Sequence, residues 1–184
     1  SEGNYGVSIL NDCKYGHDIH QNNIALTLIK SSVRPDETAG RSRPHEFVYA
    51  IYPHKGGFRE SQVQQRAMEL NFPALLGSAA PGNPKPSGIL CGGDKAGFVH
   101  TDSDHVVIDT VKRAEEEEAV IVRFYEYKNQ KDDQVTLFFS RPVKKAVVTN
   151  LIERELPEEN AAVEGGRVVV PMRGYEIKTL KVYF

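Results

Sequence analysis

The sequence predicts an all-β protein of β-sandwich architecture with one short helix, and three observations lead to this prediction. Most segments alternate apolar and polar residues with a period of two, as half-buried strands do. In the C-terminal half, such segments recur about every 8–12 residues with turn-forming residues between them, which is the pattern of two packed sheets. Helical periodicity is found in one segment only, near residues 60–71.

Three strands are expected before this helix. Residues 5–10 and residues 23–29 alternate as half-buried strands do. Residues 46–52 are apolar at both odd and even positions, which predicts a central strand covered on both faces.

The helix is expected because Val63, Ala67 and Leu70 follow the i, i+4, i+7 spacing of an amphipathic helix. Ser61 is its expected N-cap. After it, residues 78–96 are expected to form a linker, because prolines without an N–H and glycines without a side chain interrupt every periodic pattern there. The chain is therefore predicted to divide into residues 1–94 and residues 95–184.

The second part is expected to consist of strands alone, forming a sandwich of its own. The expected strands are residues 105–111, 119–127, 135–140, 145–151, 167–171 and 176–183. Residues 115–118 are four consecutive glutamates, and like charges in series prefer water, so they are expected at a solvated hairpin tip.

Composition excludes several classes of function. The chain of 184 residues carries 23 Lys and Arg against 25 Asp and Glu, a net charge of −2. The basic excess typical of a nucleic-acid-binding protein is missing, so no nucleic-acid partner is expected. No apolar run approaches the ~20 residues of a membrane span, so no membrane partner is expected either. Cys13 and Cys91 are the two cysteines, which favours a reducing compartment and a cytoplasmic location.

Few residues are spaced in a way that indicates chemistry. His17 and His20 lie three apart, on opposite faces of an extended segment, and are expected to be exposed turn residues rather than metal ligands. The glycines of residues 88–93 lack the flanking strand, helix and Lys-Ser/Thr of a phosphate loop. Carboxylates suited to glycoside hydrolysis are present, but their spacing says little about distance in a β-protein. No catalytic residue and no metal ligand is assigned.

The most unusual stretch is Asn11-Asp-Cys-Lys-Tyr-Gly16, which follows the first strand and combines polar, thiol, cationic and aromatic groups. Two interpretations are open. The stretch is either a structural turn, or a loop at the rim of a substrate pocket where Asn11, Asp12, Lys14 and Tyr15 contact a sugar.

Several segments together resemble one family of enzymes. The block from Tyr5 to Gly16, the stretch His45-Glu-Phe-Val-Tyr-Ala50 and the closing strand Tyr175-Glu-Ile-Lys-Thr-Leu180 are similar to the C-terminal β-region of α-mannosidases of glycoside hydrolase family 38. The cytosolic and bacterial branch is the most similar, and the resemblance covers essentially the whole chain. One departure is the basic residues 39–44, where relatives tend to be acidic, which leaves any contact made by that loop in doubt.

The resemblance implies a retaining exo-α-mannosidase that removes terminal α-linked mannose from oligosaccharides. It places the Asp nucleophile, the proton donor and a divalent metal, usually Zn²⁺, in an N-terminal catalytic domain. This chain is then the non-catalytic β portion, with that domain and a mannose-containing oligosaccharide as partners and no cofactor of its own. Residues 1–94 would be the C-terminal part of a large mutarotase-like sandwich, and residues 95–184 a smaller sandwich.

Further expectations follow from the start of the chain, which has no initiator Met and enters a strand pattern at Tyr5. We expect it to belong to a longer polypeptide and to expose an apolar face. Residues 1–94 are then less stable alone than the rest, or pair with another copy in a homo-oligomer. Two other functions stay open. One is a free-standing carbohydrate-binding sandwich, against which the absence of Trp weighs, and the other is an aldose epimerase, by analogy of fold alone.

Overall fold

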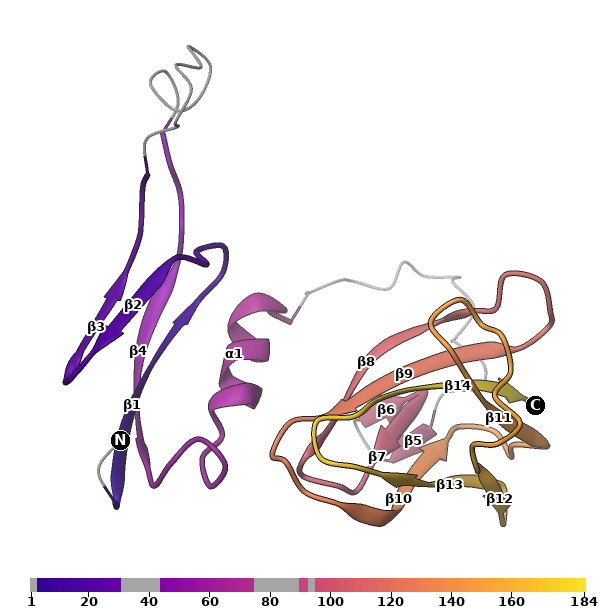
Figure 1. The fold of residues 1–184 in the computed structure, drawn as a ribbon. Helices are drawn as coiled ribbons and strands as arrows, with labels where there is room; N and C mark the ends of the chain where they lie inside the picture. The colour runs from indigo at the N-terminus through magenta and orange to yellow at the C-terminus, as the bar shows by residue number, and fades with distance from the viewer. Residues whose placement is uncertain (1–2, 31–43, 75–89, 93–94) are drawn as a thin grey trace. The chain divides into compact units, whose positions relative to one another are not determined.

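The computed structural model describes residues 3–30, 44–74, 90–92 and 95–184, and its chain divides into two compact units (Figure 1). The first unit is Ser1–Ala79 and the second is Ala80–Phe184. Most of the expected linker and of the basic segment 39–44 lies outside the described residues.

The first unit contains two small antiparallel sheets and the helix. Strand β1 (Tyr5–Asn11) pairs with β4 (Tyr49–Lys55), with Ile9 opposite Ile51. Strands β2 (His17–His20) and β3 (Asn23–Leu26) form a hairpin, and α1 (Val63–Asn71) packs against β1.

The two faces of the β1–β4 sheet differ in exposure. Gly6 and Leu10, which share one face, are buried. On the opposite face Tyr5 is 50% exposed and Ile51 67% exposed. The prediction that residues 46–52 form a covered central strand is therefore wrong: among the described residues β4 pairs with β1 alone, and apolar side chains of its outer face meet solvent.

Helix α1 is shorter than the expected 60–71, because its first turn begins at Val63 and Gln62 is its N-cap. The expected cap, Ser61, lies one residue too early. Its hydroxyl donates to the carbonyl oxygen of Phe58 at 2.9 Å, which holds Ser61 in the preceding turn. The same oxygen still accepts the N–H of Val63 at 3.4 Å, a partial cap from outside the helix.

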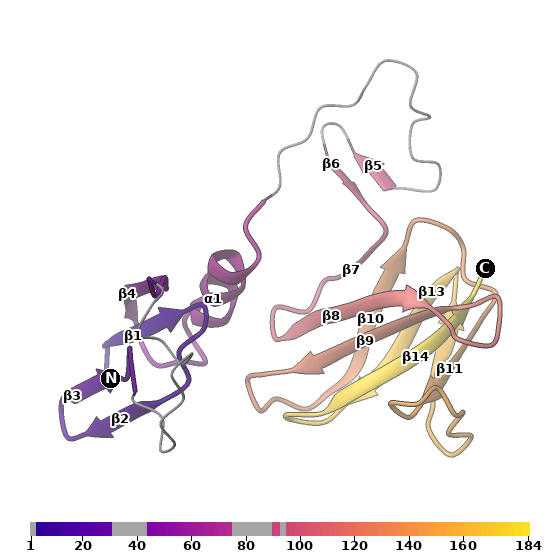
Figure 2. The ribbon, with the colours of Figure 1, turned by 90° about the horizontal axis from the view of Figure 1, so that it is seen from above.

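The second unit is a β-sandwich of two four-stranded antiparallel sheets, seen from above in Figure 2. One sheet has the order β12-β13-β10-β7 and the other the order β11-β14-β9-β8. The strands are β7 (Val99–Thr101), β8 (Val106–Arg113), β9 (Val120–Glu126), β10 (Asp132–Phe139), β11 (Lys145–Thr149), β12 (Ala162–Glu164), β13 (Arg167–Met172) and β14 (Ile177–Tyr183). The expected all-β sandwich is confirmed here.

The core of the sandwich lies between its two sheets. Val122, Phe124, Leu137, Val168 and Leu180 contribute to it and have no exposed surface. In the first unit, by contrast, Leu10 and Val63 are the only described hydrophobic residues that are buried. Burial of apolar surface is the main stabilising contribution in folding, so the second unit carries most of the stability of this chain.

Residues 90–97 differ from the expectation of a structureless linker. Strands β5 (Leu90–Gly92) and β6 (Lys95–Gly97) pair as a hairpin within the second unit. Glycine and proline both disfavour strands, so a segment rich in them carries no pattern from which this short ladder could be expected.

The glutamates of residues 115–118 are exposed at the turn between β8 and β9, as expected. Two of them are also bound to the sandwich. Lys112 contacts Glu115, and Lys181 Nζ lies 2.8 Å from Glu117. The hydroxyl of Tyr183 donates to Glu117, and this hydrogen bond raises the pKa of Tyr183 to about 12.

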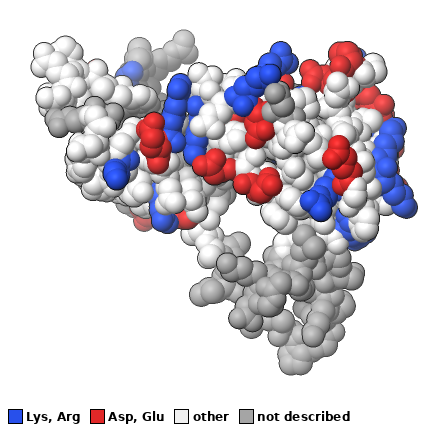
Figure 3. Space-filling view, turned by 90° about the horizontal axis from the view of Figure 1, so that it is seen from below, with Lys and Arg blue, Asp and Glu red and all other residues white. Residues whose placement is uncertain are grey.

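One face of the molecule carries both acidic and basic side chains. The face drawn in Figure 3 shows both signs interspersed among its described residues, without a broad region of one sign. In the part of the chain that the structure describes, none of the helices has the length and apolarity needed to cross a membrane.

Candidate functional site

The loop of residues 11–15, singled out by its composition, lies at the end of β1. Asn11 Oδ1 accepts the N–H of Lys14 at 2.6 Å, which closes a tight turn. The carbonyl oxygen of Asn11 accepts a hydrogen bond from Asn71 Nδ2 at 3.2 Å. The loop is thus anchored to the end of α1.

Asp12 fastens the same loop to the segment that leads into β4. Its N–H donates to the carbonyl oxygen of Val48 at 3.2 Å, and its Oδ1 accepts the N–H of Val48 at 3.1 Å. The Cys13 thiol and this N–H lower the pKa of Asp12, and the hydrogen bond to Asp12 raises the pKa of Cys13. A thiol with a raised pKa is a poor nucleophile, so Cys13 is not an activated cysteine.

The other two members of the predicted set differ in exposure, since Lys14 is half-buried and Tyr15 is exposed. Tyr15 is 88% exposed, and Lys14 Nζ lies 4.8 Å from the centroid of the Phe47 ring. The structure therefore divides the four predicted residues. The side chains of Asn11 and Asp12 hold the loop in shape, that of Lys14 lies against the Phe47 ring, and that of Tyr15 is exposed to solvent.

A groove of about 350 Å³ adjoins the loop. It is lined by Val7, Ser8, Ile9, Asn11, His17, Ile19, Ile24, Leu26 and Val63. Most of these side chains are aliphatic, with Asn11 and His17 among the polar ones. The sequence did not indicate this groove, because its walls come from β1, from the β2–β3 hairpin and from α1.

His17 was expected in a turn, but it begins β2 and lines the groove. Its Nδ1 lies 3.0 Å from the carbonyl oxygen of Tyr15. A carbonyl accepts only, so Nδ1 carries the proton and the Nε2 of a neutral ring is an acceptor.

Ser8 and His54 form a second polar pair missed by sequence reasoning. Ser8 Oγ lies 3.0 Å from His54 Nε2, while His54 Nδ1 donates to the carbonyl oxygen of Gly56 at 3.1 Å. A Cβ on Gly6 would lie 2.2 Å from His54 Cε1, so the ring needs a glycine beneath it. This pair fixes β1 against β4.

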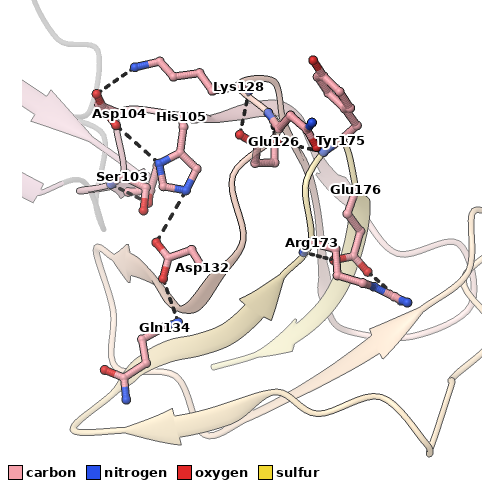
Figure 4. A network of polar contacts seen from close by, with 12 residues as sticks. Ser103, Asp104, His105, Glu126, Lys128, Asp132, Gln134, Arg173, Tyr175 and Glu176 are labelled. Carbon is pink, nitrogen blue, oxygen red and sulfur yellow. Dashed lines mark hydrogen bonds and ion pairs between the residues drawn. The ribbon is translucent and has the colours of Figure 1, made fainter. Parts of the chain in front are cut away.

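The second unit holds a buried polar network at one end of the sandwich (Figure 4). Glu126, only 2% exposed, accepts the N–H groups of Lys128 at 2.6 Å, Asn129 at 2.9 Å and Tyr175 at 2.8 Å. Asn129 and Tyr175 both have positive φ, 58° and 59°. The carboxylate thus holds two strained loop residues in place.

Beside Glu126, His105 lies between two carboxylates. Its Nδ1 is 3.4 Å from Asp104 and its Nε2 is 3.5 Å from Asp132. Lys128 Nζ lies 2.8 Å from Asp104, and this contact lowers the pKa of Asp104 and raises that of Lys128. His105 is 7% exposed, whereas the Asp104 side chain beside it is 80% exposed.

Comparison with known proteins connects both units with the C-terminal regions of glycoside hydrolases. Residues 105–180 match the model of the glycosyl hydrolases family 38 C-terminal beta sandwich domain. Residues 1–38 match the model of the glycosyl hydrolases family 38 C-terminal domain. The class that the fold defines is therefore the C-terminal β-region of a glycoside hydrolase.

Individual relatives agree with these models. The chain is 34% identical over 183 residues to human alpha-mannosidase 2C1, covering 98% of this chain and 17% of that protein. It is 30% identical over 205 residues to an alpha-mannosidase of Saccharomyces cerevisiae, covering 18% of that protein. A family 38 glycosyl hydrolase structure from Enterococcus faecalis matches with a TM-score of 0.70 at 20% identity, over all of this chain and 21% of that one.

The chain belongs to glycosyl hydrolase family 38, as part of its C-terminal region. It spans less than a fifth of the length of the relatives that it matches.

Proposed function

We propose that this chain is the non-catalytic C-terminal β portion of a retaining exo-α-mannosidase that removes terminal α-linked mannose from oligosaccharides. The observation that carries the proposal is the match to alpha-mannosidase 2C1 along 98% of the chain. Because the chain corresponds to 17% of that relative, the catalytic machinery is assigned to another part of a longer polypeptide.

Support from the fold comes from the first unit. Its β1–β4 sheet exposes Tyr5, Val7, Tyr49 and Ile51 on one face, beside an aliphatic groove. Exposed apolar surface of this kind is characteristic of interfaces. We infer that this face packs against the rest of the enzyme and that the loop of residues 11–15 reaches the rim of the substrate pocket.

The metal of the family does not fit the residues found here. In residues 3–30, 44–74 and the described parts of the second unit, no three His, Cys, Asp or Glu side chains are placed to hold a metal ion. Zn²⁺ is therefore proposed for the catalytic domain, and no step of the reaction is assigned to this chain. A cytoplasmic location is also proposed, in keeping with the free, exposed Cys13.

The assay that tests this proposal is hydrolysis of an aryl α-mannoside. The isolated chain with added Zn²⁺ is expected to release no more aryl alcohol than buffer does, whereas the longer polypeptide turns over. Turnover by the isolated chain that a mannose-like inhibitor blocks would contradict the proposal. A saturable signal when the isolated chain is titrated with mannose oligosaccharides would favour the free-standing binding module instead.

The role of the loop is tested separately in the longer polypeptide. Tyr15→Ala is expected to raise KM several-fold without changing thermal stability, because the ring is 88% exposed. Asp12→Ala is expected to lower kcat/KM and also to loosen the loop, since it removes the bond to Val48. Glu116→Ala, at the exposed β8–β9 tip of the second unit and outside the proposed contact face, is the control. Unchanged kinetics in both loop variants would leave the loop a structural turn.

A further inference from the structure

A depression of about 330 Å³ lies at one end of the β12-β13-β10-β7 sheet, in the second unit. It is lined by His100, Phe138, Phe139, Ser140, Arg141, Pro142, Gly165, Gly166 and Arg167. Nothing in the proposed function uses it. We call it the Arg141–Arg167 depression.

The lining carries positive charge without a compensating acid. Arg141 and Arg167 form no ion pair with any described residue, and no Asp or Glu is among the lining residues. Glu164 lies opposite Arg167 in the register of β12 and β13, but the two side chains make no ion pair. Two unpaired guanidinium groups around one hollow create a local potential that favours an anion.

The aromatic ring in the depression is already covered. His100 on β7 stacks on Phe138 of β10, with ring centroids 4.9 Å apart and an interplanar angle of 11°. Arg167 on β13, the other neighbour of β10, has its Cζ 5.2 Å from the Phe138 centroid. Phe138 is therefore already in contact with both His100 and Arg167.

The walls of the depression are held rigidly. The N–H of Val143 donates to the carbonyl oxygen of Gly166 at 3.0 Å, which joins the turn after β10 to the turn before β13. Gly166 has φ 81°, and a Cβ there would lie 3.1 Å from Pro142 Cβ, so the two turns are in close contact. Ser140 Oγ, in the same lining, is buried and has no hydrogen-bond partner among the described residues.

We propose that the Arg141–Arg167 depression binds a compact oxyanion of the phosphate class, either free or carried by a sugar. Arginine's planar fork of donors matches the oxygens of a phosphate group, and charge-assisted hydrogen bonds of this kind are roughly twice as strong as neutral ones. The turn after β10 and the turn before β13 are already in contact, so less conformational entropy is lost when an anion binds between them. This binding site is independent of the proposed mannosidase role, so either can fail without the other.

The experiment titrates the 184-residue chain with inorganic phosphate at low ionic strength and follows backbone amides by two-dimensional NMR. Saturable shifts confined to the lining of the depression, among them those of Arg141, Gly165, Gly166 and Arg167, are expected. Arg141→Gln and Arg167→Gln are each expected to weaken binding about tenfold. Glu164→Gln, which removes the nearest carboxylate in register, is expected to strengthen it. Arg113→Gln, on β8 of the other sheet, removes the same charge elsewhere and is the matched control.

Two further probes separate the sources of the anion. A hexose 6-phosphate that saturates the site more tightly than inorganic phosphate supports a phosphorylated sugar, and equal affinity supports free phosphate, while the unphosphorylated hexose is expected to cause no shift. Absence of saturation with both phosphate probes overturns the proposal. So does an affinity that falls equally in the Arg141, Arg167 and Arg113 variants, because that result describes net charge and not a site. Arg141 is exposed on a turn, so its variant is not expected to unfold.

Discussion

Replacing Phe124 by alanine is expected to lower the free energy of unfolding of the second unit by about 3–5 kcal/mol. Phe124 lies on β9, in the middle of the β11-β14-β9-β8 sheet, and has no exposed surface. Its ring fills the space between the two sheets with residues such as Val122 and Leu180. Truncating the side chain to a methyl group removes the favourable free energy of transferring the ring from water to the core. It also leaves a cavity that the two sheets do not close.

Urea unfolding followed by circular dichroism measures this change, since the chain has no Trp to report by fluorescence. The matched substitution in the first unit is Ile51→Ala on β4. Ile51 is 67% exposed, so its loss in the isolated chain is expected to change the free energy of unfolding by less than about 0.5 kcal/mol. A loss below about 1 kcal/mol for the Phe124 variant would contradict the assignment of the core.

The second large effect is expected for Glu126→Gln, which should lower the free energy of unfolding of the second unit by about 3 kcal/mol. The carboxylate accepts the backbone N–H groups of Lys128, Asn129 and Tyr175 at 2.6–2.9 Å, and the N–H of Gln130 also points to it. An amide of the same shape places an NH₂ group against at least one of these donors and removes the charge. Glu116→Gln, at the exposed β8–β9 tip, is the control and is expected to be neutral.

The direction of the pKa shift of Glu126 determines how the effect of Glu126→Gln on stability depends on pH. Burial raises its pKa, but the N–H groups of Tyr175, Lys128, Gln130 and Asn129 together outweigh burial, and the net pKa lies below its ordinary value of 4.5. A carboxyl group with a lowered pKa in the folded state adds stability above its unfolded pKa and loses it as pH falls. The difference in the free energy of unfolding between the native chain and the Glu126→Gln variant should therefore shrink below pH 4.5. A constant difference down to pH 2 would show that charge plays no part.

The sandwich could be predicted from the sequence because alternation and turn spacing are local properties. The strand expected at residues 119–127 is β9 (Val120–Glu126), and the strand expected at 176–183 is β14 (Ile177–Tyr183). Strands β2, β7 and β12 were missed because each has only three or four residues, too few to establish a period.

The polar anchors could not be predicted in the same way. Glu126 ends a strand, where a charged residue is usually solvated, and its burial depends on the loop at Tyr175, far away in the sequence. The groove beside the loop of residues 11–15 could not be predicted for the same reason. Its lining combines Val63 of α1 with Val7 of β1, which are far apart in the sequence. The prediction that β4 is covered on both faces was wrong for a related reason. Apolar residues on both faces indicate that a strand is covered, but not that the covering part belongs to the same 184 residues.

The two units are thus unequal as folding units. The second has a closed core between two sheets, whereas the first buries Leu10 and Val63 and exposes an apolar sheet face. This asymmetry agrees with the proposal that the first unit packs against a larger neighbour. Apolar area removed from water at that contact would supply the stability that the first unit lacks.

Hydrogen exchange of the β1 and β4 amides, compared between the isolated monomeric chain and the longer polypeptide, tests this dependence most directly. The account predicts fast exchange in the isolated chain, well above that of β9 and β14, and slowing by about a hundredfold or more in the longer polypeptide. Equal protection of both units in the isolated monomer, with no further slowing in the longer polypeptide, would contradict it.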